Sequence, residues 1–184
     1  MEIQTIIKTK RLILRPFELS DSKIVQKLAG DSKIAETTLN IPHPYEDGMA
    51  ESWINTHKDN LINETSITYA IVENETGELI GAISLMGINK VHKKAELGYW
   101  IGVPYWGKGY CTDASQAIVE FGFKELNLNR IYALAFESNK GSWRVMEKMG
   151  MKYEGTRRQD VVKNGRFKDL RMYSILLEEF NAKS

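Results

Sequence analysis

A glycine-rich segment in the middle of the chain constrains the fold more than any other stretch. It runs Ile101-Gly102-Val103-Pro104-Tyr105-Trp106-Gly107-Lys108-Gly109-Tyr110-Cys111-Thr112. An apolar run typical of a strand, Ala95 to Ile101, comes directly before it. Apolar residues spaced by three and four follow, which predicts a helix with a stripe of Cys111, Ala114, Ala117, Ile118 and Phe121. The predicted order is therefore strand, glycine loop, helix.

A junction of this kind suits an anion. The first N–H groups of a helix have no partners within the helix, and the helix dipole is positive there. Gly107 and Gly109 let the backbone approach a phosphate closely, and Lys108 adds a positive charge. A plain tight turn can have the same composition, so the loop alone leaves both interpretations open.

The neighbouring residues narrow the choice of phosphate ligand. Gly102 to Lys108 imitates the start of a P-loop, but Gly109 stands where a P-loop needs Ser or Thr to hold magnesium. This argues against a magnesium-dependent kinase or NTPase. No stretch carries the three spaced glycines and acidic residue of a dinucleotide site. The remaining hypothesis is a carrier bound through its pyrophosphate, without magnesium.

A second motif follows thirty residues later, Asn139-Lys140-Gly141-Ser142-Trp143-Arg144-Val145-Met146-Glu147-Lys148-Met149-Gly150-Met151. Together the two motifs resemble those of the GNAT superfamily of acyl-CoA-dependent N-acyltransferases. Trp106 stands where that family commonly has Gln or Arg, and Cys111 stands where it commonly has Gly or Ala. The Trp-Gly-Lys-Gly form, the segment Lys10 to Pro16 and the pair Glu154-Gly155 are similar to the RimJ/RimL branch, which acetylates N-terminal amines of ribosomal proteins.

The resemblance implies a cosubstrate and the residues that bind it. The expected cosubstrate is acetyl-CoA, with its pyrophosphate on the glycine loop and its pantetheine arm between two diverging strands. The binding residues carried over onto this chain are Ile101, Val103, Gly107, Lys108, Gly109, Tyr110, Cys111, Thr112, Asn139 and Ser142.

Periodicity and turn residues predict one α+β domain over residues 1–184, built on one mixed sheet. Four helices are expected. One follows Ser20, one follows the glycine loop, and one begins at Asn139. The remaining helix contains the stripe Met49, Trp53, His57 and Leu61. The stripe is interpreted mainly as core, although in the family this region walls the acceptor site. Expected strands cover 9–15, 66–73, 79–88, 93–101 and 130–136, with a final hairpin over 153–177. The resemblance makes this the GNAT fold, a mostly antiparallel seven-stranded sheet with about four helices that splays between the fourth and fifth strands.

Acetyl transfer to an amine needs a base and a proton for the departing thiolate. Glu96 is the first candidate for the base, since it shares a strand face with Gly98 and Trp100, where a cleft would raise its pKa. A glutamate at the sheet surface is the structural alternative. The resemblance to the RimJ/RimL branch gives Asp160 of the last hairpin as a second candidate, although the matched position could fall on Val161, and water is a third. Ser142 is the candidate acid through the resemblance, and a backbone N–H near Ile101 is expected to meet the oxyanion. A covalent role for Cys111 is not favoured, because no histidine neighbours it.

Composition restricts the class and the partners. Of the 184 residues, 42% are apolar and 27% charged, and the net charge of +1 argues against direct nucleic-acid binding. The chain has a single cysteine, no apolar run long enough to span a membrane, and no leader-like start. We therefore expect a cytoplasmic protein. No metal is expected, because the three histidines lack ligand spacing. Related proteins and an edge on the final hairpin favour a homodimer or higher homo-oligomer.

The leading hypothesis is an acetyl-CoA-dependent N-acetyltransferase whose acceptor is the N-terminal amine of a ribosomal or other protein. Two alternatives stay open. One is an acetyltransferase for a small-molecule amine such as a polyamine, an amino acid or an antibiotic, and the other is a non-catalytic sensor of acyl-CoA. A deep acidic pocket would favour a small cation, whereas an open groove would favour a peptide.

Overall fold

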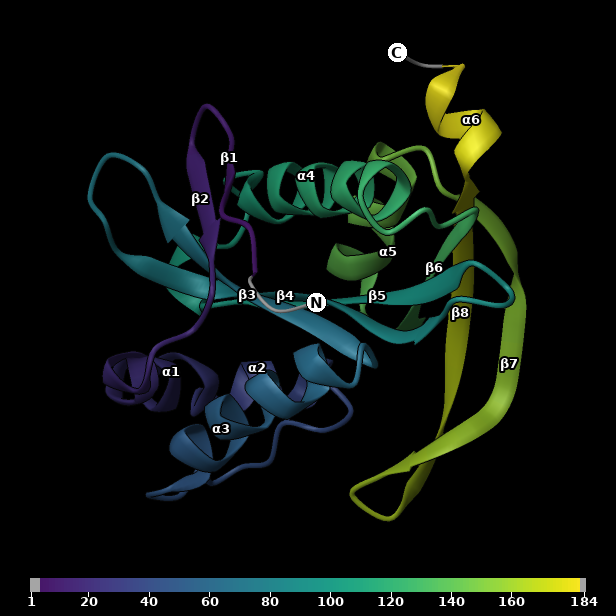
Figure 1. The fold of residues 1–184 in the computed structure, drawn as a ribbon. Coiled ribbons are helices and arrows are strands. Elements are labelled where there is room, and N and C mark those ends of the chain that lie inside the picture. The colour runs from purple at the N-terminus through teal and green to yellow at the C-terminus, as the bar shows by residue number, and fades with distance from the viewer. Residues whose placement is uncertain (1–3, 183–184) are drawn as a thin grey trace.

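A computed structural model describes residues 4–182 of the chain. These residues form one sheet of eight strands in the order β1-β2-β3-β4-β5-β6-β8-β7, and only the β5–β6 pair is parallel (Figure 1). The strands are β1 (Ile7–Lys8), β2 (Leu12–Arg15), β3 (Ser66–Glu73), β4 (Leu79–Asn89), β5 (Lys94–Ile101), β6 (Arg130–Phe136), β7 (Lys152–Lys163) and β8 (Arg166–Leu176). The predicted mixed, mostly antiparallel sheet is confirmed.

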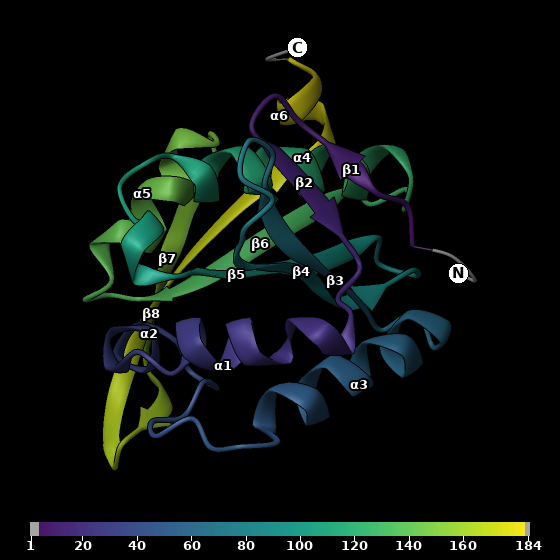
Figure 2. The ribbon, with the colours of Figure 1, turned by 90° about the vertical axis from the view of Figure 1, so that its left-hand side faces the viewer.

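Helices cover both faces of the sheet. The helices are α1 (Ser22–Ala29), α2 (Ser32–Thr37), α3 (Met49–Ile62), α4 (Tyr110–Lys124), α5 (Lys140–Lys148) and α6 (Leu177–Asn181), with 3₁₀ turns η1 (Leu19–Asp21) and η2 (Val103–Tyr105). Helices α1, α2 and α3 lie on one face, and α4 and α5 lie on the other (Figure 2). The sheet is thus the middle of three layers, and a side chain's face decides which helices it meets.

Three elements were not predicted, and each is short. The expected first strand over 9–15 is two strands, because Thr9 donates its N–H to the Leu12 carbonyl and turns the chain between β1 and β2. Helix α2 has six residues and is capped by the Asp31 side chain, which accepts from the Lys33 N–H. Leu177, expected at the end of the last strand, instead begins α6. Elements of two to six residues are too short to show a period.

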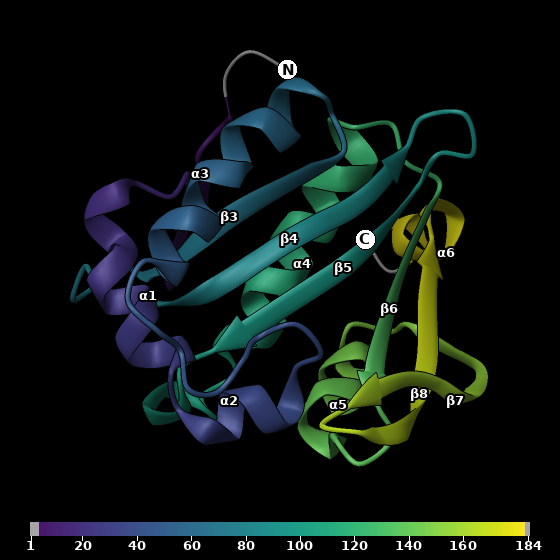
Figure 3. The same cartoon turned by 90° about the horizontal axis from the view of Figure 1, so that it is seen from below.

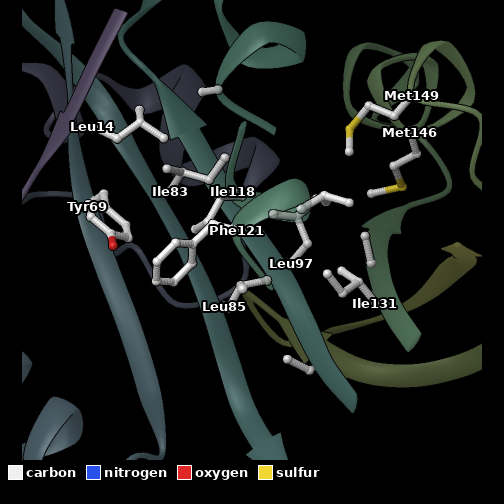
Figure 4. Packing of buried hydrophobic residues seen from close by; sticks show 14 of the residues in the cluster. Leu14, Tyr69, Ile83, Leu85, Leu97, Ile118, Phe121, Ile131, Met146 and Met149 are labelled. Carbon is white, nitrogen blue, oxygen red and sulfur yellow. The ribbon is translucent and has the colours of Figure 1, made fainter. Parts of the chain in front are cut away.

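The main core lies between the sheet and the α4–α5 layer. Leu85 and Leu97 from the sheet pack near Ile118 and Phe121, which belong to the predicted stripe of α4 (Figure 4). Met146 and Met149 of α5 extend the same cluster. Fully burying one such side chain contributes about 1.5–3 kcal/mol, so this layer fixes α4 on the sheet. A smaller cluster, including Val25, Ala50, Ile54 and Ala70, holds α1 and α3 on the other face.

The sheet opens between β5 and β6. Their parallel pairing joins only Lys94–Glu96 to Arg130–Tyr132, after which β6 continues against β8 alone. Figure 3 shows the two strands diverging toward the carboxyl end of β5. These are the fourth and fifth of the predicted strands, so the expected splay is confirmed. Backbone pairing stops at Glu96, and we call the opening between β5 and β6 beyond this residue the fork. Side chains from both faces of the sheet can meet there.

Candidate active site

The fork leads into a cavity of about 1420 Å³ that reaches both faces of the sheet. On one side its lining comes from α4, α5 and the glycine loop, and on the other from α1, α2, α3 and the loop between α2 and α3. Of the predicted site residues, Glu96, Ile101, Gly107, Gly109, Tyr110, Cys111, Thr112, Asn139 and Ser142 all line it. Two distant sequence motifs are therefore brought to one cavity.

The glycine loop has the backbone expected of an anion site. Gly107 and Gly109 have φ angles of 76° and 81°, in the left-handed region that favours glycine, and Gly109 is the N-cap of α4. Within the described part of the chain, no N–H group from Gly107 to Thr112 donates to another residue. Tyr110 to Thr112 form the first turn of α4, a helix of 15 residues, where the dipole is positive. The residues present fit a pyrophosphate.

Arg11 of the β1–β2 turn holds this loop in place, which sequence reasoning missed. Its guanidinium donates to the Lys108 carbonyl at 2.9 Å and to the Asp113 carboxylate at 2.7 Å. It also lies over the Tyr110 ring, with its central carbon 4.9 Å from the ring centroid. The position falls in the segment that resembles the RimJ/RimL branch, but only the tertiary structure shows what it contacts. Arg11 links the edge of the sheet to the start of α4.

Two predicted residues of the loop have other contacts. Lys108 does not line the cavity, and its ammonium nitrogen lies 5.5 Å from the centroid of the Tyr105 ring. Val103 is also outside the lining, in η2. Trp106, at the position where the resemblance expects Gln or Arg, donates its indole N–H to the Ile101 carbonyl at 2.6 Å. Trp106 therefore braces the loop, and the free N–H donors of the loop belong to its backbone.

Glu96 stands at the point where β5 and β6 separate. It lies opposite Tyr132 of β6 in the last parallel pair, and it shares the α1–α3 face with Gly98 and Trp100. Burial raises the pKa of Glu96, while a hydrogen bond with Tyr132 and the charge of Arg157 act in the opposite direction. A carboxylate with a raised pKa at the edge of a cavity is placed to accept a proton.

Tyr99 and Ser142 form a hydroxyl pair on the opposite face of the sheet. The Tyr99 hydroxyl lies 3.0 Å from the Ser142 Oγ and 3.0 Å from the Ser142 carbonyl oxygen. Burial raises the pKa of the Tyr99 phenol, so it keeps its proton at neutral pH. Sequence reasoning assigned Tyr99 only to the face of Leu97 and Ile101. Its partnership with Ser142, 43 positions away, follows from packing β5 against α5.

Asn139 caps α5 as predicted and also reaches another layer. Its side-chain oxygen accepts from the Ser142 N–H at 3.2 Å, and its amide donates to the Thr37 carbonyl at 3.2 Å. Thr37 ends α2, so one side chain joins the two sides of the cavity. The cap fixes the first turn of α5 and with it the orientation of Ser142.

The other nucleophile and carboxylate candidates are less well placed for chemistry. Burial raises the pKa of the Cys111 thiol to about 12, although a hydrogen bond with Ser115 acts in the opposite direction. A thiol that holds its proton is a poor nucleophile, in agreement with the direct-attack expectation. Asp160 lies outside the cavity lining and pairs with Arg157 at 3.5 Å. Glu96 is the carboxylate in the fork.

The α3 stripe is less buried than expected for core. Met49 and Trp53 line the cavity, whereas the fully buried residues of this helix are Ala50 and Ile54. His57 packs edge-on against the Trp53 ring, with centroids 4.5 Å apart. The stripe therefore has two parts: Met49 and Trp53 line the cavity, while Leu61 packs against the main core and Trp53 also packs against the smaller cluster.

None of the described helices combines the length and apolarity needed to span a bilayer.

Comparisons with known proteins agree with this architecture. The family model for the acetyltransferase (GNAT) domain matches residues 11–152. The N-acetyltransferase YnaD of Bacillus subtilis (strain 168) is 34% identical over 175 residues, covering 95% of this chain and 99% of YnaD. A crystal structure of a GNAT-family acetyltransferase from Bacillus anthracis superimposes with a TM-score of 0.83 at 30% identity, covering 95% of this chain and 100% of the other.

YdaF of Bacillus subtilis (strain 168), described provisionally as a ribosomal N-acetyltransferase, is 35% identical over 136 residues. That match covers 74% of this chain and 71% of YdaF, less of each than the match to YnaD. The likeness is thus to the family as a whole and singles out no acceptor. With the domain model spanning both motifs, the chain belongs to the GNAT family of acetyltransferases and is an N-acetyltransferase.

Proposed function

We propose that the protein transfers an acetyl group from acetyl-CoA to a primary amine by direct attack. The observation that carries this proposal is the single cavity through the fork, with Glu96 on one face and the Tyr99–Ser142 pair on the other. When bound, acetyl-CoA supplies the acetyl thioester. The chain must then supply a site for the carrier, a base for the amine and a proton for the thiolate.

The glycine loop and α5 are proposed to hold the carrier. The N–H groups between Gly107 and Thr112 would bind the pyrophosphate, and the fork between β5 and β6 would take the pantetheine arm. Asn139, which caps α5, would make a hydrogen bond to the pantetheine arm. The loop side chains play a smaller part, because Lys108 faces Tyr105.

Glu96 is proposed as the base. An amine arrives as its ammonium form at neutral pH, so a proton must leave before nitrogen can attack. Glu96 accepts that proton directly or through water, and its raised pKa makes the carboxylate a better base than an exposed glutamate. On the opposite face, Ser142 donates a proton to the departing thiolate, and Tyr99 can replace it through the hydroxyl pair. The ammonium loses two protons in all, one to Glu96 before attack and one from the nitrogen as the amide forms. The thiolate gains one proton, and the other is released to solvent.

The geometry favours a small-molecule amine over the predicted protein N-terminus. The Lys163 ammonium, at the tip of the β7–β8 hairpin, donates to the carbonyls of Leu39 and Ile41 at 3.0 Å each. These bonds tie the hairpin to the loop between α2 and α3 at the edge of the cavity, and a polypeptide acceptor would have to pass this edge. The protein N-terminus remains the second candidate, supported by the likeness to YdaF.

Calorimetry of acetyl-CoA binding, followed by free-thiol release against a panel of amines and N-terminal peptides, tests the proposal. Micromolar binding with amine-dependent release is the expected result. Binding without release from any amine would instead support the acyl-CoA sensor. Absence of binding would refute the interpretation of the glycine loop.

A further inference from the structure

The half of the cavity between the sheet and α1–α3 is lined mainly by apolar and aromatic side chains, with Asn40, Ser52 and Ser84 among its polar ones, and it faces Glu96. We infer that the acceptor is a small primary amine with one positive charge and an aromatic body, such as an arylalkylamine. This inference rests on the proposed function, because it assigns the acceptor to the same cavity and the same base.

The walls of this half carry apolar groups from four segments. Helices α1, α2 and α3 and the loop after α2 contribute Val25, Ala29, Ile34, Ile41, Tyr45 and Trp53. Three aromatic side chains, counting Trp100 of β5, line it. Aromatic pairs prefer offset or edge-on contacts, and such contacts are available to a flat ligand here.

The space on the floor beside the base is filled by a flexible side chain, that of Met86. Glu96, Gly98 and Trp100 alternate along one face of β5, and Gly98 places no side chain between the carboxylate and the indole. A Cβ at Gly98 would lie 2.5 Å from the terminal methyl of Met86, so Met86 alone covers this space. A flexible thioether can yield to a ligand ring. The amine can therefore reach Glu96 while its apolar body lies over Gly98 toward Trp100.

The charges of the cavity argue against a polyamine. Among the described residues that line it, only Glu96 and Asp47 carry carboxylates. Asp47 is exposed and accepts from the Gln26 amide at 2.7 Å. A polyamine would place its further ammonium groups against apolar walls, and burying a charge without a partner is costly. The cavity thus matches one charge, at Glu96.

The edge of the cavity also bears on which acceptor can bind. Lys163 is outside the lining but bonds to the carbonyls of Leu39 and Ile41, two loop residues that line the cavity. Its positive charge repels a polycation, and its bonds narrow the entrance for a chain. A small monoamine carries a single charge and no long chain, so both obstacles are smaller for it.

The experiment uses the full chain saturated with coenzyme A for calorimetry and with acetyl-CoA for kinetics. The probes are 2-phenylethylamine, spermidine and a tripeptide amide that begins with Phe. We expect 2-phenylethylamine to exceed spermidine in affinity and in kcat/KM by at least about tenfold, since ring burial contributes that much. Equal or better values for spermidine would overturn the inference, and so would a higher kcat/KM for the tripeptide.

A variant that adds a carboxylate to the cavity tests the same preference in a folded protein. Met49 lines the cavity at the first position of α3, where a glutamate is also favoured by the helix dipole. Met49→Glu should lower the preference for 2-phenylethylamine over spermidine by about tenfold. Ile24→Glu is the matched control, because Ile24 is 44% exposed on α1 and outside the lining. An unchanged ratio in Met49→Glu, with coenzyme binding intact, would contradict the assignment.

The two proposals fail in different ways. If the coenzyme binds and no amine releases thiol, the proposed function is refuted, while the calorimetric comparison of the two amines still decides the acceptor class. If thiol is released most rapidly with spermidine, the proposed function stands and the monoamine inference is overturned.

Discussion

The α4–α5 side of the cavity is organised by polar contacts, and the α1–α3 side by aromatic ones. On the first side Arg11 holds the glycine loop, and Tyr99 bonds to Ser142. On the second side Phe17, Trp53 and His57 pack ring against ring, and neither nitrogen of the buried His57 ring has a hydrogen-bond partner. We propose that the polar side binds the coenzyme, whose chemistry is constant, and that the apolar side selects the acceptor. Substitutions can separate the two roles.

Glu96 lies between the two sides, and its loss should have the largest effect. Glu96→Gln keeps the shape of the side chain but removes the base, so kcat/KM should fall by about 10²–10³-fold with coenzyme affinity unchanged. In the parent, activity should rise with pH through the raised pKa of Glu96, because only the carboxylate accepts a proton. The pH–rate profile of the variant should be flat over the same range. A variant as active as the parent would move the base to Asp160 or water.

The Tyr99–Ser142 pair should come next. Tyr99→Phe keeps the ring packed and removes one hydroxyl, so kcat should fall by about tenfold with little change in KM. Ser142→Ala should behave similarly. Because the two hydroxyls act as one unit, the double variant should be little worse than the poorer single variant. Fully additive losses would show that each residue acts alone.

Arg11 should matter for coenzyme binding more than Lys108 does. Arg11→Met removes two charge-assisted hydrogen bonds that position the loop, and we expect coenzyme affinity by calorimetry to fall by about five- to tenfold. Lys108→Ala should weaken affinity less, since the Lys108 ammonium faces Tyr105 and its carbonyl remains. The reverse order would show that charge at the loop outweighs its positioning.

The apolar side predicts an effect of pH on stability and not on the reaction. Burial lowers the pKa of His57 from 6.5 to about 4. Between these values the unfolded chain binds the proton and the folded chain does not, so the free energy of unfolding should fall as the pH drops from 6.5 toward 4. His57→Phe should show a smaller loss of Tm between pH 7 and 5, and His92→Gln, at an exposed turn, should follow the parent. If Tm falls equally with pH in the parent and in His57→Phe, the lowered pKa of His57 is not the cause of the pH dependence.

Sequence reasoning was most successful where a pattern was long. The alternation in β5 assigned Glu96 and Tyr99 to opposite faces, and the stripe of α4 located the main core. The turn at Asn164-Gly165 is also as predicted, with φ angles of 51° and 72°. Shorter elements such as α2 carry no period. For α3 the same apolar spacing fits both a core helix and a cavity wall, because the spacing does not show whether the stripe packs against protein or faces a cavity.

The sequence by itself determined the α+β class, the strand–loop–helix junction and the two motifs, because local backbone preferences and periodicity act over neighbouring residues. Only the tertiary structure decided that Arg11 braces the glycine loop, that Tyr99 pairs with Ser142, and that Lys163 meets the loop at residues 39–41. Each of these contacts joins residues at least 43 positions apart. Their formation depends on how the layers pack around the fork, and no local pattern encodes that arrangement.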